Sequence, residues 1–499
     1  MKGVLESIKN KDIKYNTKNY EGAPAVKMSL INKLNQFCMT ATLSNTFYVS
    51  QPDLVGYAFA LFEGILDSGI NPKDIADAII NGRNNGYMRT VNIVGLTVLS
   101  ILPNKQYFKY AFPLVIKTGN DLEDFINIAK KYRGGLGRSI KTTVNKWIDT
   151  YIKSLYLVVK YRKQLANVIR LTRPKTDSPV YDFIMKSIKH KVNIDTALEN
   201  YDYLNAFEYI KNMIKHKNWD EVLKTLNNYD ISPVQLLGQV NPPNNVWVEL
   251  SKNMGTMMFL KYLNKLDREK VFNTNTGLEI LKNKINTKSL IKNKVFPFRL
   301  YIAYINLTNN KVKNYLADVL DDYVKIYNWD KWDKNIVIAP DISGSMISSI
   351  GKVTPAVIAG MFSGILYKGI ETSILLPWDT AVCVDKVLPR KDSVISHIKS
   401  ISEAYGGGTF MEAPVEEMLK KNIKADIAIF ITDSEEWGSG WLNSWIEYKK
   451  KNQNAKAVLL RVDPYDTQPF SDDIAEKYGI YQVFGWNDNV LKWIEEVVL

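Results

Sequence analysis

Oxygen-bearing side chains in the last third of the sequence have the types and spacing to hold a hard metal ion. Asp341, Ser343 and Ser345 stand at alternate positions directly after an apolar run, Thr409 follows a run of glycines, and Asp433 ends another apolar run. Mg²⁺ takes about six oxygen ligands near octahedral geometry and sheds water reluctantly, so two carboxylates and three hydroxyls suit it, some of them acting through water. We therefore predict a site for Mg²⁺ or another divalent cation, with one position left open.

Other kinds of site lack their parts. With three histidines and two distant cysteines, the chain has no zinc-ligand spacing, no disulfide framework and poor material for a Ser-His-Asp triad. The glycine run before Thr409 is not followed by the Lys-Ser/Thr pair of a phosphate-binding loop. A helix N-cap is the alternative for Asp341 to Ser345, but it leaves Thr409 and Asp433 unexplained.

Short apolar strands must position these side chains. From residue 334 onward such strands alternate with helical segments, which predicts a mostly parallel, doubly wound α/β sheet whose sites lie at the carboxyl ends of its strands. Pro340 removes a backbone donor directly before Asp341, so we expect a bend there. The predicted strands are Asn335–Ala339, Ser373–Pro377, Asp426–Thr432, Ala457–Val462 and Tyr481–Phe484.

The pattern DxSxS, a glycine-poised threonine and a strand-terminal aspartate resembles the metal-ion-dependent adhesion site of von Willebrand factor type A domains. All five positions match. The resemblance implies that Asp341, Ser343, Ser345, Thr409 and Asp433 bind the metal and that a partner protein offers a carboxylate to the open position. A site with only two acidic ligands leaves the ion able to attract one more.

The rest of the chain has the opposite charge. Residues 331–499 carry 18 Lys and Arg against 23 Asp and Glu, whereas residues 1–330 carry 47 against 29. Such asymmetry points to a nucleic-acid-binding module joined to a second module of another kind. The alternative explanation is that the base composition of the genome makes the chain rich in Lys and Asn. We therefore divide the chain into residues 1–330 and 331–499.

Helical periodicity dominates residues 1–330. In Asn120–Lys130 the predicted N-cap Asn120 has Glu123 three residues on, and apolar residues recur at i, i+3, i+4 and i+7 from Leu122. Asn71 with Pro72 predicts another helix start. Many short helices suit an irregular HEAT-like helical array rather than one bundle, and no competing strands are expected. The other helices are predicted at Leu54–Ser68, Tyr107–Ile116, Thr142–Val159, Tyr203–His216 and Glu249–Leu263.

Basic residues are densest between residues 130 and 175, with aromatic residues between them. This mixture suits single-stranded RNA, because phosphates take the charge and bases stack on rings. Solvated helix faces over buried aromatic side chains are an equally weighted alternative. The candidate RNA-binding residues are Lys131, Arg133, Arg138, Lys141, Arg162, Lys163, Arg170, Arg173 and Lys175, and the aromatic residues are Tyr132, Trp147, Tyr151, Tyr156 and Tyr161.

A basic helical array before an A domain resembles the Ro 60 kDa autoantigen family, whose helical part is the TROVE module. Segments similar to its motifs are Leu43–Tyr48, Arg133 to Trp147, Tyr161–Lys163, Val168–Leu171, Trp247 to Asn264, Phe296–Leu300 and Thr432–Trp437. The resemblance implies a HEAT-like ring that binds Y RNA-like small noncoding RNAs on its outer surface and single-stranded 3′ ends through its hole. Where the family has His-Arg-Asp, this chain has Leu165-Ala166-Asn167, which removes one family contact.

We thus expect a non-enzymatic scaffold of a small ribonucleoprotein, with an exoribonuclease or another protein offering an acidic residue to the metal. A protein-interaction adaptor without RNA function is the alternative, and a metal-dependent nuclease lacks its carboxylate cluster. Scarce cysteine suggests a reducing compartment, and the longest nearly apolar run, Ile93–Pro103, is about half of the ~20 residues of a bilayer span. We therefore expect a cytoplasmic protein.

Overall fold

The computed structural model describes most of the chain. The described residues are 17–18, 24–27, 34–35, 38–39, 51–85, 88–175, 178–186, 201–233, 242–293, 295–327, 329, 332–347, 354–404, 406–434, 440–462, 467–484, 490–491 and 494.

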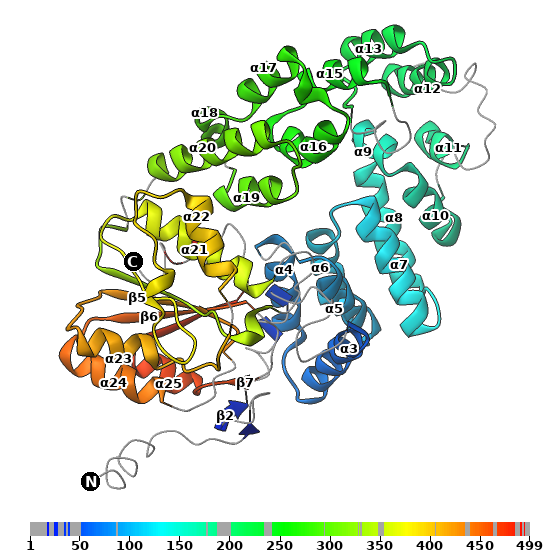
Figure 1. Cartoon of the computed structure of the whole chain (residues 1–499). Coiled ribbons are helices and arrows are strands. Elements are labelled where there is room, and N and C mark those ends of the chain that lie inside the picture. The colour runs from blue at the N-terminus through cyan, green and yellow to red at the C-terminus, as the bar shows by residue number, and fades with distance from the viewer. Residues whose placement is uncertain are drawn as a thin grey trace. The chain divides into compact units, whose positions relative to one another are not determined.

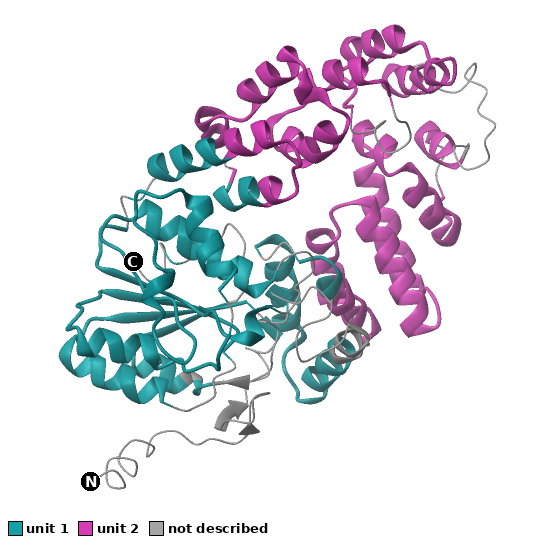
Figure 2. Cartoon of the chain, in the orientation of Figure 1, with its two compact units in different colours: residues 1–92, 296–301, 317–499 teal, residues 93–295, 302–316 magenta. Residues whose placement is uncertain are grey.

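Two compact units divide the chain differently from the change in charge. One unit contains residues 1–92, 296–301 and 317–499, and the other contains residues 93–295 and 302–316 (Figure 2). The secondary structure nevertheless changes where the sequence predicts, because α20 (Asn310–Ile326) is followed by the first long strand, β3 (Ile336–Pro340). The functional division at residue 330 stays a prediction.

Helices make up nearly all of the described residues between 51 and 326 (Figure 1). They are short and joined by short turns, as the periodicity predicts. Besides α20 they are α3 (Gln51–Asp67), α4 (Pro72–Asn84), α5 (Thr90–Ile101), α6 (Gln106–Val115), α7 (Gly119–Arg133), α8 (Arg138–Tyr151), α9 (Leu155–Lys160), α10 (Arg162–Thr172), α11 (Pro179–Lys186), α12 (Asp202–Lys215), α13 (Trp219–Asn228), α15 (Asn244–Lys252), α16 (Thr256–Arg268), α17 (Asn275–Lys284), α18 (Thr287–Lys292) and α19 (Pro297–Ile305).

Two helix starts differ in how well their capping signals predict them. The Asn71 side chain accepts a hydrogen bond from the Lys73 amide at 2.9 Å and caps α4, as predicted. The start of α7 was predicted wrongly at Asn120. Thr118 caps it instead, in a reciprocal capping box with Asp121, which satisfies two backbone donors at once.

Two predicted helices are each broken in two. Residues 152–154 separate α8 from α9, and residues 253–255 separate α15 from α16. Ser154 and Gly255 adopt extended backbone conformations directly before the second helix of each pair. Apolar periodicity continues through such breaks, so it does not reveal them.

The expectation that residues 1–330 hold no strands is wrong at the N-terminal end. Short strands β1 (Thr17–Lys18) and β2 (Pro24–Lys27) pair with each other, and β2 also pairs with β7 (Thr467–Gln468), all antiparallel. Four residues or fewer are too short for an alternating pattern to be visible.

The C-terminal part contains the predicted parallel sheet. Its strand order is β4-β3-β5-β6-β8, and all four pairings are parallel. All five predicted strands are confirmed to within two residues at each end. Besides β3 they are β4 (Ile374–Leu375), β5 (Ile427–Thr432), β6 (Lys456–Arg461) and β8 (Ile480–Phe484).

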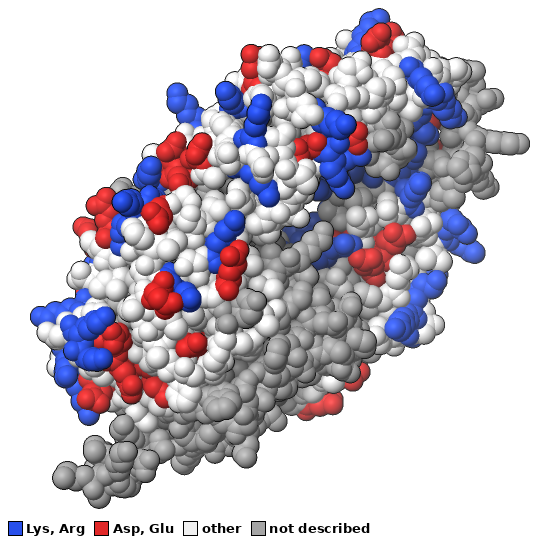
Figure 3. All heavy atoms as spheres, in the orientation of Figure 1, with Lys and Arg blue, Asp and Glu red and all other residues white. Residues whose placement is uncertain are grey.

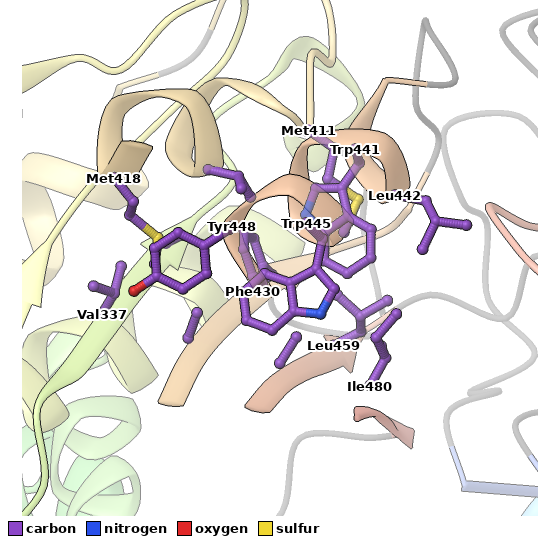
Figure 4. Packing of buried hydrophobic residues seen from close by; sticks show 14 of the residues in the cluster. Val337, Met411, Met418, Phe430, Trp441, Leu442, Trp445, Tyr448, Leu459 and Ile480 are labelled. Carbon is purple, nitrogen blue, oxygen red and sulfur yellow. The ribbon is translucent and has the colours of Figure 1, made fainter. Parts of the chain in front are cut away.

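Helices cover both faces of this sheet. On one face, Trp441 and Trp445 of α24 (Trp441–Lys451) pack with Phe430 of β5, Leu459 of β6 and residues of α23 (Ala413–Lys420) and α25 (Asp472–Lys477) (Figure 4). On the other, α21 (Pro355–Gly369) packs against β3 and α22 (Val394–Ser402). The central strands β3 and β5 are buried along their whole length, so they are apolar and only their ends carry polar groups.

No helix in the described part of the chain is both long enough and apolar enough to cross a bilayer. The apolar run Ile93–Pro103 lies mostly in α5, whose residues 91–100 are all buried in the protein.

Candidate metal centre and basic helix ends

The loop after β3 arranges three of the predicted metal ligands. The Asp341 carboxylate accepts a hydrogen bond from the Ser343 amide at 2.8 Å, and the Ser343 and Ser345 hydroxyl oxygens lie 3.3 Å apart. A short 3₁₀ turn, η3 (Gly344–Ile347), keeps Ser345 next to this carboxylate loop. The alternating spacing in the sequence therefore directs three oxygen-bearing side chains toward one point.

The end of β5 brings the fourth ligand. The Thr432 hydroxyl donates to Asp341 Oδ2 at 2.6 Å and accepts from the Ser434 amide at 2.9 Å, so Asp433 follows directly on a segment bound to Asp341. Ser434 adopts a left-handed backbone (φ 60°), a strained conformation of the kind that collects at functional sites. Strands β3 and β5 are neighbours whose following helices cover opposite faces of the sheet, which is where ligands bind in such folds.

The glycine run holds the fifth ligand beside the same loop. The Gly406 amide donates to the Ile342 carbonyl at 3.3 Å, and the Phe410 amide donates to the Asp379 carbonyl at 2.9 Å, which anchors the loop on either side of Thr409. Gly407 has φ 67°, and a Cβ there would lie 2.8 Å from the Asp379 carboxylate. Only glycine fits this position without strain, so the glycine run lets the loop that carries Thr409 lie beside Ile342 and Gly344.

All five predicted ligands are buried, and Asp341 and Asp433 have no exposed surface. Burial raises the pKa of Asp341 to about 7, the nearby Asp433 raises it too, and hydrogen bonds from Ser343 and Thr432 act in the opposite direction. A bound divalent cation would stabilise two buried carboxylates with this mutual repulsion. The donor set thus fits Mg²⁺, which these five residues would hold with water completing the shell.

Pro340 does not distort this edge of the sheet. Its carbonyl accepts from the Trp378 amide at 3.1 Å, so its nitrogen faces the side of β4, beyond the last residue of that strand. On the side of β5 the ladder continues, because the Asp341 amide donates to the Ile431 carbonyl at 2.9 Å. The missing donor therefore falls where few ladder bonds remain.

Two neighbours of the site were not predicted from the sequence. Thr432 orients Asp341, and Asp379 lies against the glycine loop. A polar residue at the carboxyl end of a parallel strand is the signal for both, since Thr432 ends β5 and Asp379 follows β4 closely.

Within the described residues no group of three or more His, Cys, Asp or Glu forms a richer metal cluster. Residues 435–437 of the Thr432–Trp437 motif lie outside the described residues, as does the Leu43–Tyr48 motif.

The predicted RNA-binding cations belong mainly to a parallel helix pair. Gly119 of α7 packs on Tyr161, and Asn167 of α10 donates to Glu123 of α7 at 2.8 Å, so α7 and α10 run in the same direction. Their last turns, and the first turn of α8, point toward the same end. We call the exposed or half-exposed cations there the basic helix ends: Lys131, Arg133, Arg138, Lys141, Arg170, Arg173 and Lys175. Lys163 is exposed at the opposite end of α10.

The prediction that Arg162 binds RNA is corrected by the structure, because its charge is paired inside the protein. Its side chain is 8% exposed, and its guanidinium donates to Glu208 at 2.7 Å. The same guanidinium lies 5.4 Å from the Phe183 ring and 5.5 Å from the Phe207 ring. A buried guanidinium needs such a partner, so Arg162 joins α10 to α12 rather than to a ligand.

Of the five interleaved aromatic residues, Tyr151 is buried and Trp147, Tyr156 and Tyr161 are half-buried, which favours the structural alternative for these four. Trp147 stacks on the buried Tyr151 with ring centroids 4.2 Å apart and donates to the Ile116 carbonyl. Tyr132 is exposed at 39% and lies beside Lys131. Tyr132 is therefore the aromatic residue at the basic helix ends that is open to a base.

The family departure at Leu165-Ala166-Asn167 has a structural reason. Leu165 and Ala166 are fully buried, whereas Asn167 is exposed and bonds Glu123 of α7. Apolar residues at the first two positions extend the core under α10. Charged side chains there would require a partner in that core.

One cluster near the basic segment was not predicted. Lys160 Nζ donates to the Tyr156 hydroxyl at 3.3 Å and lies 5.3 Å from the ring centroids of Tyr156 and Tyr161. Burial raises the pKa of Tyr262 in α16, with Lys160 lowering it and Tyr156 raising it. Tyr262 is thus close to both, a long-range contact that no local spacing reveals.

Known proteins share part of this sequence and this fold. Residues 235–334 match the TROVE domain model. This part of the chain is similar to the TROVE domain. The structure of the chain also matches the crystal structure of the Deinococcus radiodurans Ro (RSR) protein with a TM-score of 0.61, covering 94% of this chain and 100% of that one. At 16% identity this likeness shows a common fold, a mostly helical part followed by a parallel five-stranded α/β part. The TROVE match over residues 235–334 and the common fold confirm the resemblance to the Ro family.

A curated relative matches part of the chain. A stretch of 199 residues is 30% identical to an uncharacterized protein of Methanocaldococcus jannaschii. The match covers 38% of this chain and 48% of that protein, so the chain spans about half the length of the relative.

Proposed function

We propose that this protein binds RNA through the basic helix ends and scaffolds a small ribonucleoprotein. The convergence of cations from α7, α8 and α10 supports this most directly, because separate sequence segments present charge toward one end. Phosphates neutralised by these side chains would supply most of the affinity. Y RNA-like small noncoding RNAs and single-stranded 3′ ends are the proposed ligands, following the Ro-like fold.

The α/β part has a separate proposed role. Asp341, Ser343, Ser345, Thr409 and Asp433 hold Mg²⁺ or another divalent cation, and a partner protein such as an exoribonuclease supplies a carboxylate. We propose binding rather than catalysis for this site, because hydroxyl ligands activate water poorly and the donor set lacks the carboxylate cluster that holds two metal ions in nucleases. An adaptor without RNA function is the second candidate, and the buried carboxylate pair is the observation that favours it.

Salt dependence tests the RNA proposal. We expect a structured RNA with a single-stranded 3′ tail to bind the full chain with an affinity that falls steeply as salt rises. Each neutralised phosphate contributes about 0.7 to 0.9 to the slope of log affinity against log salt. Filter binding over a salt series measures the slope. Binding that is tight and independent of salt would contradict the proposal, and absence of RNA binding would leave the adaptor.

A further inference from the structure

A second group of cations lies in the acidic α/β part, at the amino ends of the strands, whereas the metal centre lies at their carboxyl ends. Its members come from the C-terminal ends of three helices, the turn before β5 and the first residue of β6. Figure 3 shows Lys and Arg side chains, with Asp and Glu beside them, at the outer end of the α23–α24 layer. We call these residues the lysine edge: Lys420, Lys421, Lys424, Lys449, Lys450, Lys451, Lys456 and Lys477.

Hydrogen bonds hold the three turns of the lysine edge side by side. The Tyr448 hydroxyl accepts from the Ala425 amide at 2.7 Å and donates to the Ile423 carbonyl at 2.9 Å, which joins the turn before β5 to the end of α24. The Ala457 amide donates to the Gly479 carbonyl at 3.0 Å, which joins the turn before β6 to the turn after α25. The lysines therefore stand on a rigid base.

Charge within this edge is unbalanced. Residues 418–425 and 448–456 contain five lysines besides Lys421 and Lys456 but no Asp or Glu, whereas Glu417, Asp426, Glu447 and Glu476 border these segments and the turn after α25. Lys421 pairs with Glu417 of α23 at 2.6 Å. Burial lowers the pKa of Lys449, and the like charge of Lys456 lowers it further. Favourable interaction with helix C-termini accounts for lysines in the last turn of a helix but not for Lys424 and Lys456, which lie near strand starts.

Two tyrosines give the lysine edge a second chemical feature. Lys477 Nζ lies 4.9 Å from the Tyr478 ring centroid, and Lys456 Nζ lies 5.9 Å from that of Tyr481. Both rings are partly exposed. Cations that take phosphates beside rings on which bases stack are the combination that single-stranded nucleic acid uses, whereas an acidic peptide needs no rings.

We propose that the lysine edge is a second RNA-binding surface, which takes the sugar-phosphate backbone of single-stranded RNA independently of the basic helix ends. It lies on the part of the chain that has net negative charge, so overall charge does not reveal it.

The test uses a parent variant of the full chain with Arg133→Glu, Arg138→Glu, Arg170→Glu and Arg173→Glu. These changes remove charge from the basic helix ends, so the remaining binding of labelled oligouridine reports on other surfaces. Adding Lys450→Glu and Lys451→Glu should weaken that binding about tenfold or more and lower the salt slope by about 0.7 for each phosphate that is no longer neutralised. The matched control adds Lys391→Glu and Lys399→Glu, two exposed lysines on and before α22, and should change binding less than about twofold.

Equal effects of the two pairs, or no oligouridine binding in the parent variant, would overturn the proposal. Labelled poly-glutamate that binds as tightly as oligouridine and is lost with the same pair would show a surface for acidic protein instead. If the parent variant binds RNA as tightly as the unaltered chain, the role of the basic helix ends fails. The comparison of the two lysine pairs still decides the lysine edge.

Discussion

Replacing Asp341 with Asn should abolish the stabilisation of the α/β part by Mg²⁺. The unaltered chain should unfold at a higher temperature as Mg²⁺ is added, because an ion that binds only the folded state contributes about 2.7 kcal/mol at 100 times its dissociation constant. Asp341→Asn removes one of two charged ligands while Asn can still accept from the Ser343 amide and donate to the Thr432 hydroxyl. Thermal unfolding with and without Mg²⁺ measures the shift.

The metal-free state of this variant gives an independent readout. Without Mg²⁺ the variant should be at least as stable as the unaltered chain, since the repulsion between two buried carboxylates is gone. Asp385→Asn is the matched control, because this carboxylate is exposed and pairs with Lys386. A Mg²⁺ shift that survives in Asp341→Asn would show that the ion binds elsewhere.

Replacing Arg162 with Ala should cost about 3–5 kcal/mol of folding free energy, the largest expected loss among the predicted RNA-binding residues. The variant leaves Glu208, 10% exposed, with Lys211 at 3.0 Å as its remaining partner. It also removes the packing of the guanidinium against Phe183 and Phe207. Calorimetric unfolding of the full chain should show this loss in a transition that Mg²⁺ does not shift.

Two further variants separate structure from RNA contact at this position. Arg170→Ala, on the same helix but exposed, should change stability by about 0.5 kcal/mol or less. Arg162→Met with Glu208→Leu should recover much of the loss, because an apolar pair replaces a buried ion pair without leaving a charge. If Arg162→Ala unfolds like the unaltered chain but loses RNA, the assignment of Arg162 to the core is wrong.

Strand positions could be predicted from the sequence, whereas helix ends could be predicted only in part. Strands buried on both faces are apolar runs, so β3, β5 and β6 were visible without any partner. The breaks at residues 152–154 and 253–255 were not visible, because apolar periodicity continues across them. The strands β1 and β2 depend on pairing with each other and with β7, and long-range pairing leaves no local pattern.

Site residues were predictable where the chemistry is local. DxSxS places its own oxygens, and a strand-terminal aspartate meets them because parallel strands end at the same edge. The fate of Arg162 was not predictable, because Glu208, Phe183 and Phe207 are distant in sequence. Basic residues four or eight positions apart look alike in sequence, yet Arg162 faces the core and Arg170 faces solvent.

The central claim is that the basic helix ends hold RNA. The most direct measurement is the dissociation constant for a structured RNA with a single-stranded 3′ tail, compared between two charge-reversed chains of equal net charge. One chain carries Glu at Arg133, Arg138, Arg170 and Arg173, and the other carries Glu at the exposed Lys224, Lys282, Lys288 and Lys292. We expect the first to bind at least about a hundredfold more weakly and with a smaller salt slope, and the second to stay close to the unaltered chain. Equal loss in both chains, or none in the first, would contradict the account.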